Sequence, residues 1–88
     1  MHTYRIRYRP RSAVPLDDLV AHQGYEWCYV LSGRMRLQLG ERETVLYKGE
    51  AAEFDTLTPH GLTAVGPEDA EIISIFNETG ARFHTQSG

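Results

Sequence analysis

Polar and apolar residues alternate along much of this chain with a period of two, the pattern of β-strands that bury one face. In residues 4–9, Tyr4, Ile6 and Tyr8 point to one face and the arginines between them point to the other. Pro10 follows, and because proline has no N–H to donate, the strand ends there or lies at a sheet edge. The arginine row suits a solvated edge strand that resists aggregation, and an anion-binding arm is the alternative.

Short runs of strand-forming residues follow one another, separated by the glycine, proline and acidic residues that are typical of turns. The predicted strands are residues 4–9, 26–31, 34–39, 43–47, 51–54, 61–65 and 72–76, with a weak last strand at 82–85. Residues 14–20 fit either a short strand or one helical turn. Turn signals recur about every eight to twelve residues, as in sandwiches and barrels. The pattern predicts an all-β, antiparallel fold with eight or more short strands.

The length of 88 residues allows one domain, but a domain of that size has a thin core. We therefore expect added stability from a second copy, as a homodimer, or from a larger parent protein. Cys28 is the only cysteine, which excludes an internal disulfide and favours the reducing cytoplasm. No apolar run approaches the roughly 20 residues of a membrane-spanning helix, and the N-terminal residues do not form a signal peptide.

The charge is distributed unevenly along the chain. Four of the nine Lys and Arg residues fall within residues 1–11, with no acidic residue among them. The rest of the chain carries all twelve acidic residues against five basic ones. Nucleic-acid binding depends on neutralising phosphates with Lys and Arg, so this acidic body is a poor surface for DNA. A role on DNA would need another domain.

The candidate chemistry lies in three residues: His22, Glu26 and His60. The first two are four positions apart, and the third comes from a distant predicted strand. Two imidazoles and one carboxylate suit a divalent first-row metal, or a polar anchor for a small ligand. The same three groups can also satisfy one another by hydrogen bonding without any ligand.

The segment from His22 to His60 resembles the two motifs of the cupin superfamily. The first motif is a histidine, three or four residues, a glutamate, six residues and a glycine, and His22, Glu26 and Gly33 match it. The second opens with a glycine and reaches its histidine eleven positions later, and Gly49 and His60 match it. The resemblance implies a small antiparallel β-barrel, the double-stranded β-helix or jelly roll.

The resemblance also implies the domain layout. Residues 1–88 would form a single cupin domain. Within it we expect an Arg-rich N-terminal strand at 1–11, the barrel at 12–78, and a C-terminal strand and tail at 79–88.

The family resemblance implies a metal site, although two positions of this sequence depart from the family pattern. Val20 stands where a complete cupin site has a further histidine, and Ala64 where the family often has asparagine. Three of the four usual ligands are present: His22, Glu26 and His60. A metal held by three protein ligands keeps positions open for water or substrate, and Zn, Fe, Mn, Ni and Cu are the candidates. The alternative is a metal-free polar pocket that recognises a small molecule.

Glu26 sets the facing of its strand, so Cys28 and Val30, which share its parity, should line the barrel interior. The other face of the strand carries Trp27, Tyr29 and Leu31. Trp27 and Tyr29 are expected to pack in the core, with a dimer interface as the alternative. In the loop before the strand, Tyr25 is a candidate gate to the pocket. The residues expected to contact a ligand are His22, Tyr25, Glu26, Cys28, Val30, Met35, Leu37, Phe54 and His60.

Within the superfamily, the chain looks most like the small cupin that follows a helix-turn-helix domain in XRE-type bacterial transcription regulators. The runs that carry this resemblance are His-Gln-Gly-Tyr-Glu, Tyr-Val-Leu-Ser-Gly, Gly-Glu-Ala-Ala-Glu-Phe-Asp and Thr-Pro-His. It implies a sensor domain that binds a small effector and reaches DNA only through a helix-turn-helix domain absent from this chain. The alternatives are a metal-dependent enzyme, such as a dioxygenase or isomerase, and a structural dimerisation module. The incomplete ligand set favours the sensor.

Overall fold

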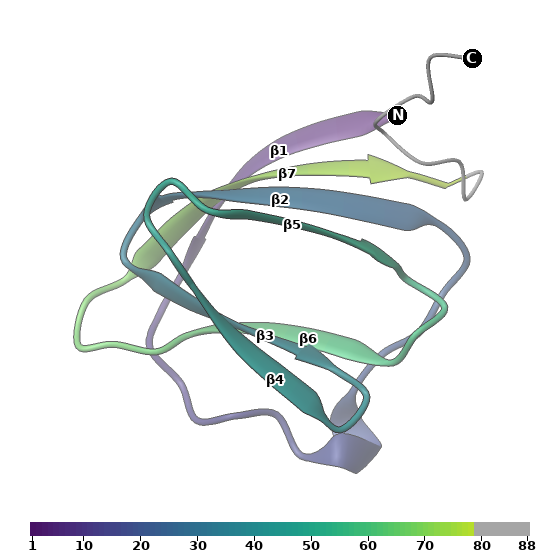
Figure 1. Cartoon of the computed structure of the whole chain (residues 1–88), viewed down its shortest axis with the longest axis horizontal. Coiled ribbons are helices and arrows are strands. Elements are labelled where there is room, and N and C mark those ends of the chain that lie inside the picture. Colours follow the sequence, from purple (N-terminus) through teal and green to yellow (C-terminus); the bar gives the residue numbers. More distant parts are fainter. Residues whose placement is uncertain (79–88) are drawn as a thin grey trace.

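The computed structural model describes residues 1–78, and every structural statement below refers to that part of the chain. It contains seven β-strands and one short 3-10 helix (Figure 1). In chain order these are β1 (His2–Tyr8), η1 (Leu16–Asp18), β2 (Tyr25–Ser32), β3 (Arg34–Leu39), β4 (Arg42–Tyr47), β5 (Ala51–Asp55), β6 (His60–Ala64) and β7 (Ala70–Asn77). The ambiguous segment at 14–20 therefore holds one helical turn. The strand predicted at 82–85 lies outside the described residues.

The strands form two antiparallel sheets that face each other (Figure 1). One sheet has four strands in the order β1-β7-β2-β5, and the other has three in the order β4-β3-β6. Neighbouring strands in space are often distant in sequence, as when β1 pairs with β7 from His2–Phe76 to Tyr8–Ala70. The predicted all-β antiparallel barrel is confirmed. No helix within residues 1–78 is long and apolar enough to cross a membrane.

The first strand follows its alternation and lies at a sheet edge. Tyr4, Ile6 and Tyr8 border the space between the sheets, whereas Arg5 and Arg7 are exposed. The guanidinium of Arg5 donates two hydrogen bonds to the Glu71 carboxylate on β7, with N–O distances of 3.1 and 3.3 Å. Exposed ion pairs contribute little to stability because water and salt screen them, so β1 is held mainly by its backbone hydrogen bonds with β7.

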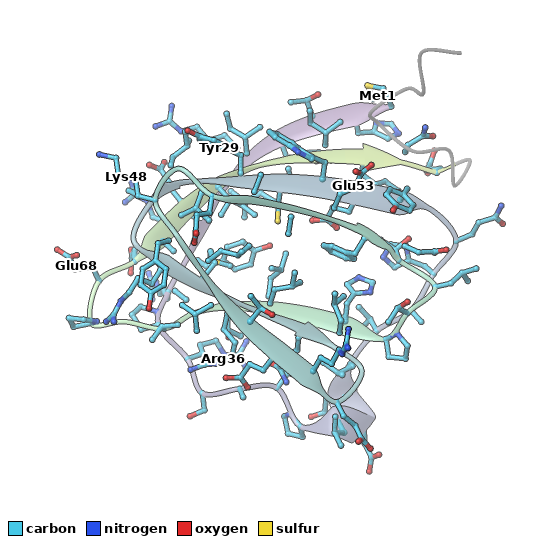
Figure 2. The ribbon with its side chains drawn as sticks, in the orientation of Figure 1. Met1, Tyr29, Arg36, Lys48, Glu53 and Glu68 are labelled. Atoms are coloured by element: carbon cyan, nitrogen blue, oxygen red, sulfur yellow. The ribbon has the colours of Figure 1, made fainter. Side chains whose placement is uncertain are left out.

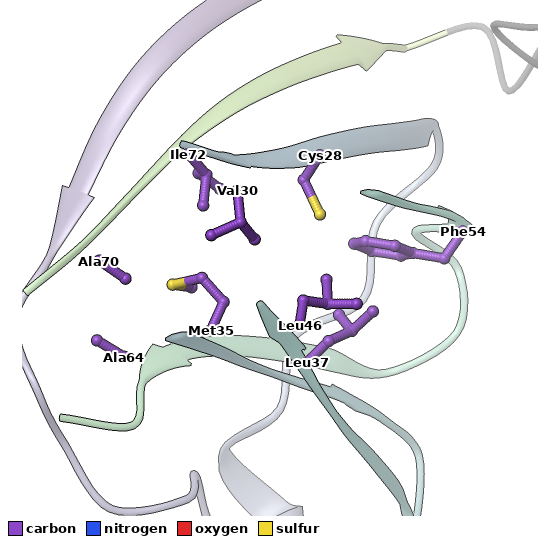
Figure 3. Packing of buried hydrophobic residues seen from close by; sticks show 9 residues of the cluster. All are labelled: Cys28, Val30, Met35, Leu37, Leu46, Phe54, Ala64, Ala70 and Ile72. Atoms are coloured by element: carbon purple, nitrogen blue, oxygen red, sulfur yellow. The ribbon is translucent and has the colours of Figure 1, made fainter. Parts of the chain in front are cut away.

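Apolar side chains from both sheets meet between them and form the core (Figure 3). Val30 and Ile72 from the four-stranded sheet and Met35 from the other are fully buried. Each buried side chain of this size contributes about 1.5–3 kcal/mol. Cys28 is buried on the same face of β2 as Val30, so the predicted parity of that strand is confirmed.

The opposite face of β2 points away from the core. Trp27 and Tyr29 are half-buried there, and their rings stack with centroids 6.0 Å apart. In Figure 2, Tyr29 lies on the side of the four-stranded sheet that is turned away from the second sheet. Packing in the core, one of the two roles expected for these aromatic residues, is therefore not their role in this structure.

One motif glycine has a steric explanation. Gly33 joins β2 to β3 with φ of +76°, in the left-handed region that favours glycine. A Cβ atom at this position would come within 2.4 Å of the Asp69 carbonyl oxygen. The tight passage from one sheet to the other therefore requires a residue without a side chain.

Candidate functional site

A cavity of about 350 Å³ opens at one end of the space between the sheets. Its walls come from β1, β2, β6, β7 and the segment before β2. The lining residues are Tyr4, Ile6, Tyr8, Val20, His22, Glu26, His60, Gly61, Leu62, Ser74 and Phe76. The cavity is small and mostly apolar, with a few polar groups, which is the usual character of a small-molecule site.

The three residues singled out in the sequence all line this cavity. His22 and His60 are brought together by two backbone connections between distant segments. Val20 and His60 exchange two backbone hydrogen bonds of 3.1 and 2.9 Å, and the His22 N–H donates to the Thr56 carbonyl at 3.0 Å. These bonds fix the segment before β2 against the segment that enters β6.

The two imidazole rings contact each other edge to face. The centroids of His22 and His60 are 5.1 Å apart, with 75° between the ring planes. His60 is buried, and its Nδ1 lies 2.8 Å from the Thr58 carbonyl oxygen. A carbonyl oxygen can only accept, so Nδ1 carries the hydrogen, and in the neutral ring Nε2 remains an acceptor. His22 is exposed, and its ring also packs against Phe76 at 5.3 Å.

Glu26 is the half-buried carboxylate of the site. Its Oε2 accepts a hydrogen bond of 3.0 Å from the Ser74 hydroxyl on β7. Burial raises the pKa of Glu26 above its ordinary value, while the Ser74 hydrogen bond and the neighbouring His60 and His22 partly lower it. Desolvation disfavours the charged form of a carboxyl group, so Glu26 keeps its proton to a higher pH than an exposed glutamate does.

Two other titratable groups near Glu26 are held in their neutral forms. Burial, together with the nearby charges of Glu26 and Cys28, raises the pKa of the Tyr8 hydroxyl to about 12. Burial, followed by the charge of Glu26, raises the pKa of the Cys28 thiol to about 11. Tyr8 is therefore a hydrogen-bond donor at neutral pH. Because the thiolate is the nucleophile, Cys28 is unsuited to nucleophilic catalysis.

The described residues do not form a metal centre. Within residues 1–78, no group of three or more His, Cys, Asp or Glu side chains is gathered so that it could hold a metal ion. Glu26 is bonded to Ser74, and Val20 occupies the place of a further histidine. His22, Glu26 and His60 thus share one cavity without forming a coordination set. Metal binding by these three residues stays a prediction.

The other residues predicted to contact a ligand do not line this cavity, although the Phe54 ring packs against His60 with centroids 5.3 Å apart. Tyr25 begins β2 on the face opposite Glu26 and does not line the cavity. The remaining five belong to the packed core: Cys28, Val30, Met35, Leu37 and Phe54. Strand parity placed Cys28 and Val30 inside the barrel correctly, but it cannot tell the packed part of the interior from the hollow part.

Several cavity residues were missed by the sequence analysis. They are Tyr4, Ile6, Tyr8, Val20, Gly61, Leu62, Ser74 and Phe76. The alternation in residues 4–8 did show that Tyr4, Ile6 and Tyr8 share a face. What joins that face to Glu26 is the pairing of β1 with β7 and of β7 with β2, and no local signal reveals such long-range pairing.

Comparison with known proteins identifies this architecture. The family model described as "Cupin domain" matches residues 5–76. No curated protein matches the chain. Among solved structures, the chain is similar to FeII HppE in complex with substrate, with a TM-score of 0.69 and 25% identity over 85% of this chain and 44% of that one.

Two further structures are similar in fold. A predicted oxalate decarboxylase from Thermotoga maritima has a TM-score of 0.72 and 21% identity, over 86% of this chain and 64% of its own. A Cupin 2 conserved barrel domain protein from Salinispora arenicola has a TM-score of 0.70 and 14% identity, over 84% of this chain and 60% of its own. The chain thus spans less than half of HppE and under two thirds of these two proteins.

Proposed function

This chain belongs to the cupin domain family, and on that premise we propose that it is a sensor domain that binds a small effector for a transcription regulator. The observation that carries the proposal is the cavity of about 350 Å³, where a half-buried carboxylate and two histidines meet apolar walls. A pocket with few polar groups suits recognition of a small molecule.

In this proposal the polar groups of the cavity orient the effector. The carboxylate of Glu26, the hydroxyl of Tyr8 and the Nε2 atom of His60 offer an acceptor, a donor and a second acceptor. The apolar part of the effector would lie against Ile6 and Phe76.

The helix-turn-helix domain that would bind DNA is not in this chain, and the acidic body fits a part that does not contact phosphates. A cytoplasmic location, expected from the lone buried cysteine, belongs to the same proposal.

We propose a homodimer as the signalling unit, with the outer face of the four-stranded sheet as its interface. Trp27 pairs with Ile75 and Tyr29 with Ile73, so four apolar side chains lie together at the centre of that face. Arginines lie at one edge, on β1, and Glu53 lies on β5 at the other edge. A two-fold axis parallel to the strands would place β1 of each copy over β5 of the other, which matches these charges and brings the apolar centres together.

An effector would act by linkage. If it fits the pocket better in one arrangement of the dimer, it shifts the population toward that arrangement by no more than its differential affinity. Glu26 and Trp27 are adjacent on β2 and face opposite sides of the sheet, so a shift of β2 on binding would reach the proposed interface directly.

The dimer is tested by sedimentation or light scattering on the wild type and on Tyr29→Glu. A glutamate in the apolar centre should weaken association by at least 100-fold, because interface aromatics carry much of the binding energy. Tyr47→Glu, at an exposed tyrosine on β4, is the matched control and should leave association unchanged. A monomeric wild type, or a Tyr29→Glu variant that stays dimeric, contradicts the interface.

The second candidate is a metal-dependent cupin enzyme, and the similarity to FeII HppE favours it. Elemental mass spectrometry of untagged protein, purified without chelator or added metal, separates the two functions. Near-stoichiometric iron, manganese, nickel, copper or zinc, with a turnover that vanishes on chelation, would establish the enzyme. A folded metal-free protein is the result expected for the sensor. A dimerisation module would show neither turnover nor any ligand whose binding depends on the cavity.

The sensor function itself is tested by screening small molecules with NMR. Bound molecules should shift the signals of Glu26, His60 and Ser74, and Glu26→Ala should weaken binding at least 10-fold in a barrel that remains folded. Glu41→Ala removes an exposed carboxylate from the turn between β3 and β4, outside both the cavity and the proposed interface, and serves as the control. A confirmed cavity ligand whose affinity is unchanged by Glu26→Ala contradicts the proposed binding mode.

A further inference from the structure

The cavity has an unbalanced charge. Among its lining residues in the described part of the chain, Glu26 is the one with a carboxylate, and none is a lysine or arginine. The arginines of β1 lie on the opposite face of that strand. Those of β3 are engaged elsewhere, since Arg34 donates to the Gly66 carbonyl and Arg36 to Thr63 and the Arg11 carbonyl. An anionic ligand would meet a carboxylate, and the basic side chains among these lining residues are the imidazoles of His22 and His60 alone.

Aromatic rings make up much of the remaining wall. Tyr4 and Tyr8 come from β1, Phe76 from β7, and His22 from the segment before β2. The ring of Phe76 is seated over Gly24, where an added Cβ would lie only 2.5 Å from it. The negative faces of aromatic rings attract a cation, and the attraction is stronger where the cation is shielded from water.

We propose that the cavity selects a small organic cation, an amine with a compact apolar body, in preference to a neutral or anionic molecule of the same shape. This inference rests on the proposed ligand-binding function and names the class of its effector. The ammonium group would lie against Glu26 and the rings of Tyr8 and Phe76, with Tyr4 at the margin of the cavity. The apolar body would contact Ile6 and Leu62, and the volume of about 350 Å³ limits it to a small one.

The test is a matched series of three probes that share one apolar body and differ in charge. Cyclohexylmethylamine is the cation, cyclohexylmethanol the neutral probe and cyclohexanecarboxylate the anion. Each is titrated at pH 7.5 into the isotopically labelled chain, and affinity is taken from the NMR shifts of Glu26, Ser74 and His60. The amine should bind at least 10-fold more tightly than the alcohol, and the carboxylate more weakly than either.

Two variants locate the origin of the preference. Glu26→Gln keeps the size of the side chain and removes its charge, so the amine should lose at least 10-fold in affinity and approach the alcohol. Phe76→Leu keeps an apolar wall and removes a ring, so the amine should weaken several-fold while the alcohol changes little. Glu41→Gln, at an exposed position in the turn between β3 and β4 and outside both the cavity and the proposed interface, should change neither.

The possible outcomes distinguish a wrong ligand class from a failure of small-molecule binding as a whole. If the alcohol or the carboxylate binds in the cavity as tightly as the amine, the cationic class is wrong while ligand binding stands. If none of the three shifts the cavity signals, the cationic class is again wrong, and the wider screen with Glu26→Ala decides the sensor function. Amine binding that is unaffected by Glu26→Gln also overturns the inference.

Discussion

The interior between the two sheets has two halves that share the same strands but differ in chemistry. Along β7, Ala70 and Ile72 belong to the packed core, whereas Ser74 and Phe76 line the cavity. Figure 3 shows Ala64, Ala70 and Met35 gathered at one end of the interior. The same alternation of inward and outward residues runs through both halves. Along β7, close packing therefore gives way to the cavity, although Phe54 of the core still packs against His60 with ring centroids 5.3 Å apart.

The largest expected effect comes from the packed half. Ile72→Ala should lower the free energy of unfolding by about 2–5 kcal/mol, because it removes a fully buried side chain and leaves a cavity in close packing. Leu62→Ala, at a half-buried position beside the existing cavity, should cost less than half as much. Urea denaturation of both variants provides the comparison. Equal losses would show that the two halves do not differ in packing.

A smaller effect is expected from the polar half. Ser74→Ala removes the hydroxyl that donates to Glu26 and should cost about 1 kcal/mol near neutral pH. Because that hydrogen bond lowers the pKa of Glu26, its loss should raise that pKa further. Carbon-13 NMR of the Glu26 carboxyl group measures the titration directly, with the exposed Ser32→Ala as control. An unchanged Glu26 titration would mean that the contact contributes nothing in solution.

The smallest expected effect is on the pH dependence of stability, which tests how far Glu26 in the cavity is shielded from water. Burial raises the pKa of Glu26 above its ordinary value of 4.5, so folding favours its protonated form. The resulting stabilisation is complete below the unfolded pKa and is lost as the pH rises through the folded pKa. Relative to Glu26→Gln, the wild type should therefore lose stability over that interval.

Because other titratable groups surround Glu26, the free energy of unfolding must be measured as a difference between the wild type and Glu26→Gln at each pH. Glu26 is faced by His22 from the preceding segment, His60 on β6, Tyr8 on β1 and Cys28 on its own strand. All four are present in both proteins, so the difference between wild type and Glu26→Gln isolates the carboxyl group. A difference that does not vary with pH would mean that the cavity half is as well solvated as the surface.

Much of the fold could be predicted from the sequence, because its causes are local. The alternation at Arg34–Leu39 predicted β3 with its bounds, and Pro10 marked the end of β1. The parity of Glu26 predicted the burial of Cys28 and Val30. These features depend on side chains two positions apart and on the properties of proline, and both can be read without knowing which strands pair.

The site was less predictable because its causes are not local. Motif spacing predicted that His22, Glu26 and His60 lie together, and all three line one cavity. The other wall was not foreseen, because Tyr8 and Phe76 reach the cavity through strand pairing across most of the chain. Val30 and Met35 were predicted to contact the ligand because they face inward, but they are packed among side chains from both sheets. Which half stays hollow depends on side-chain volumes in three dimensions.

The edge position of β1 has a kinetic consequence. The strand that supplies Tyr4, Ile6 and Tyr8 to the cavity is bonded to a single neighbour, β7. A strand secured along one edge opens locally more often than one secured along both, so the amide protons of β1 should exchange with solvent sooner than those of β2. A molecule in the cavity, in contact with β1 and β7, would slow that opening. Amide exchange along residues 2–8 would then report occupancy of the cavity without any change in the mean structure.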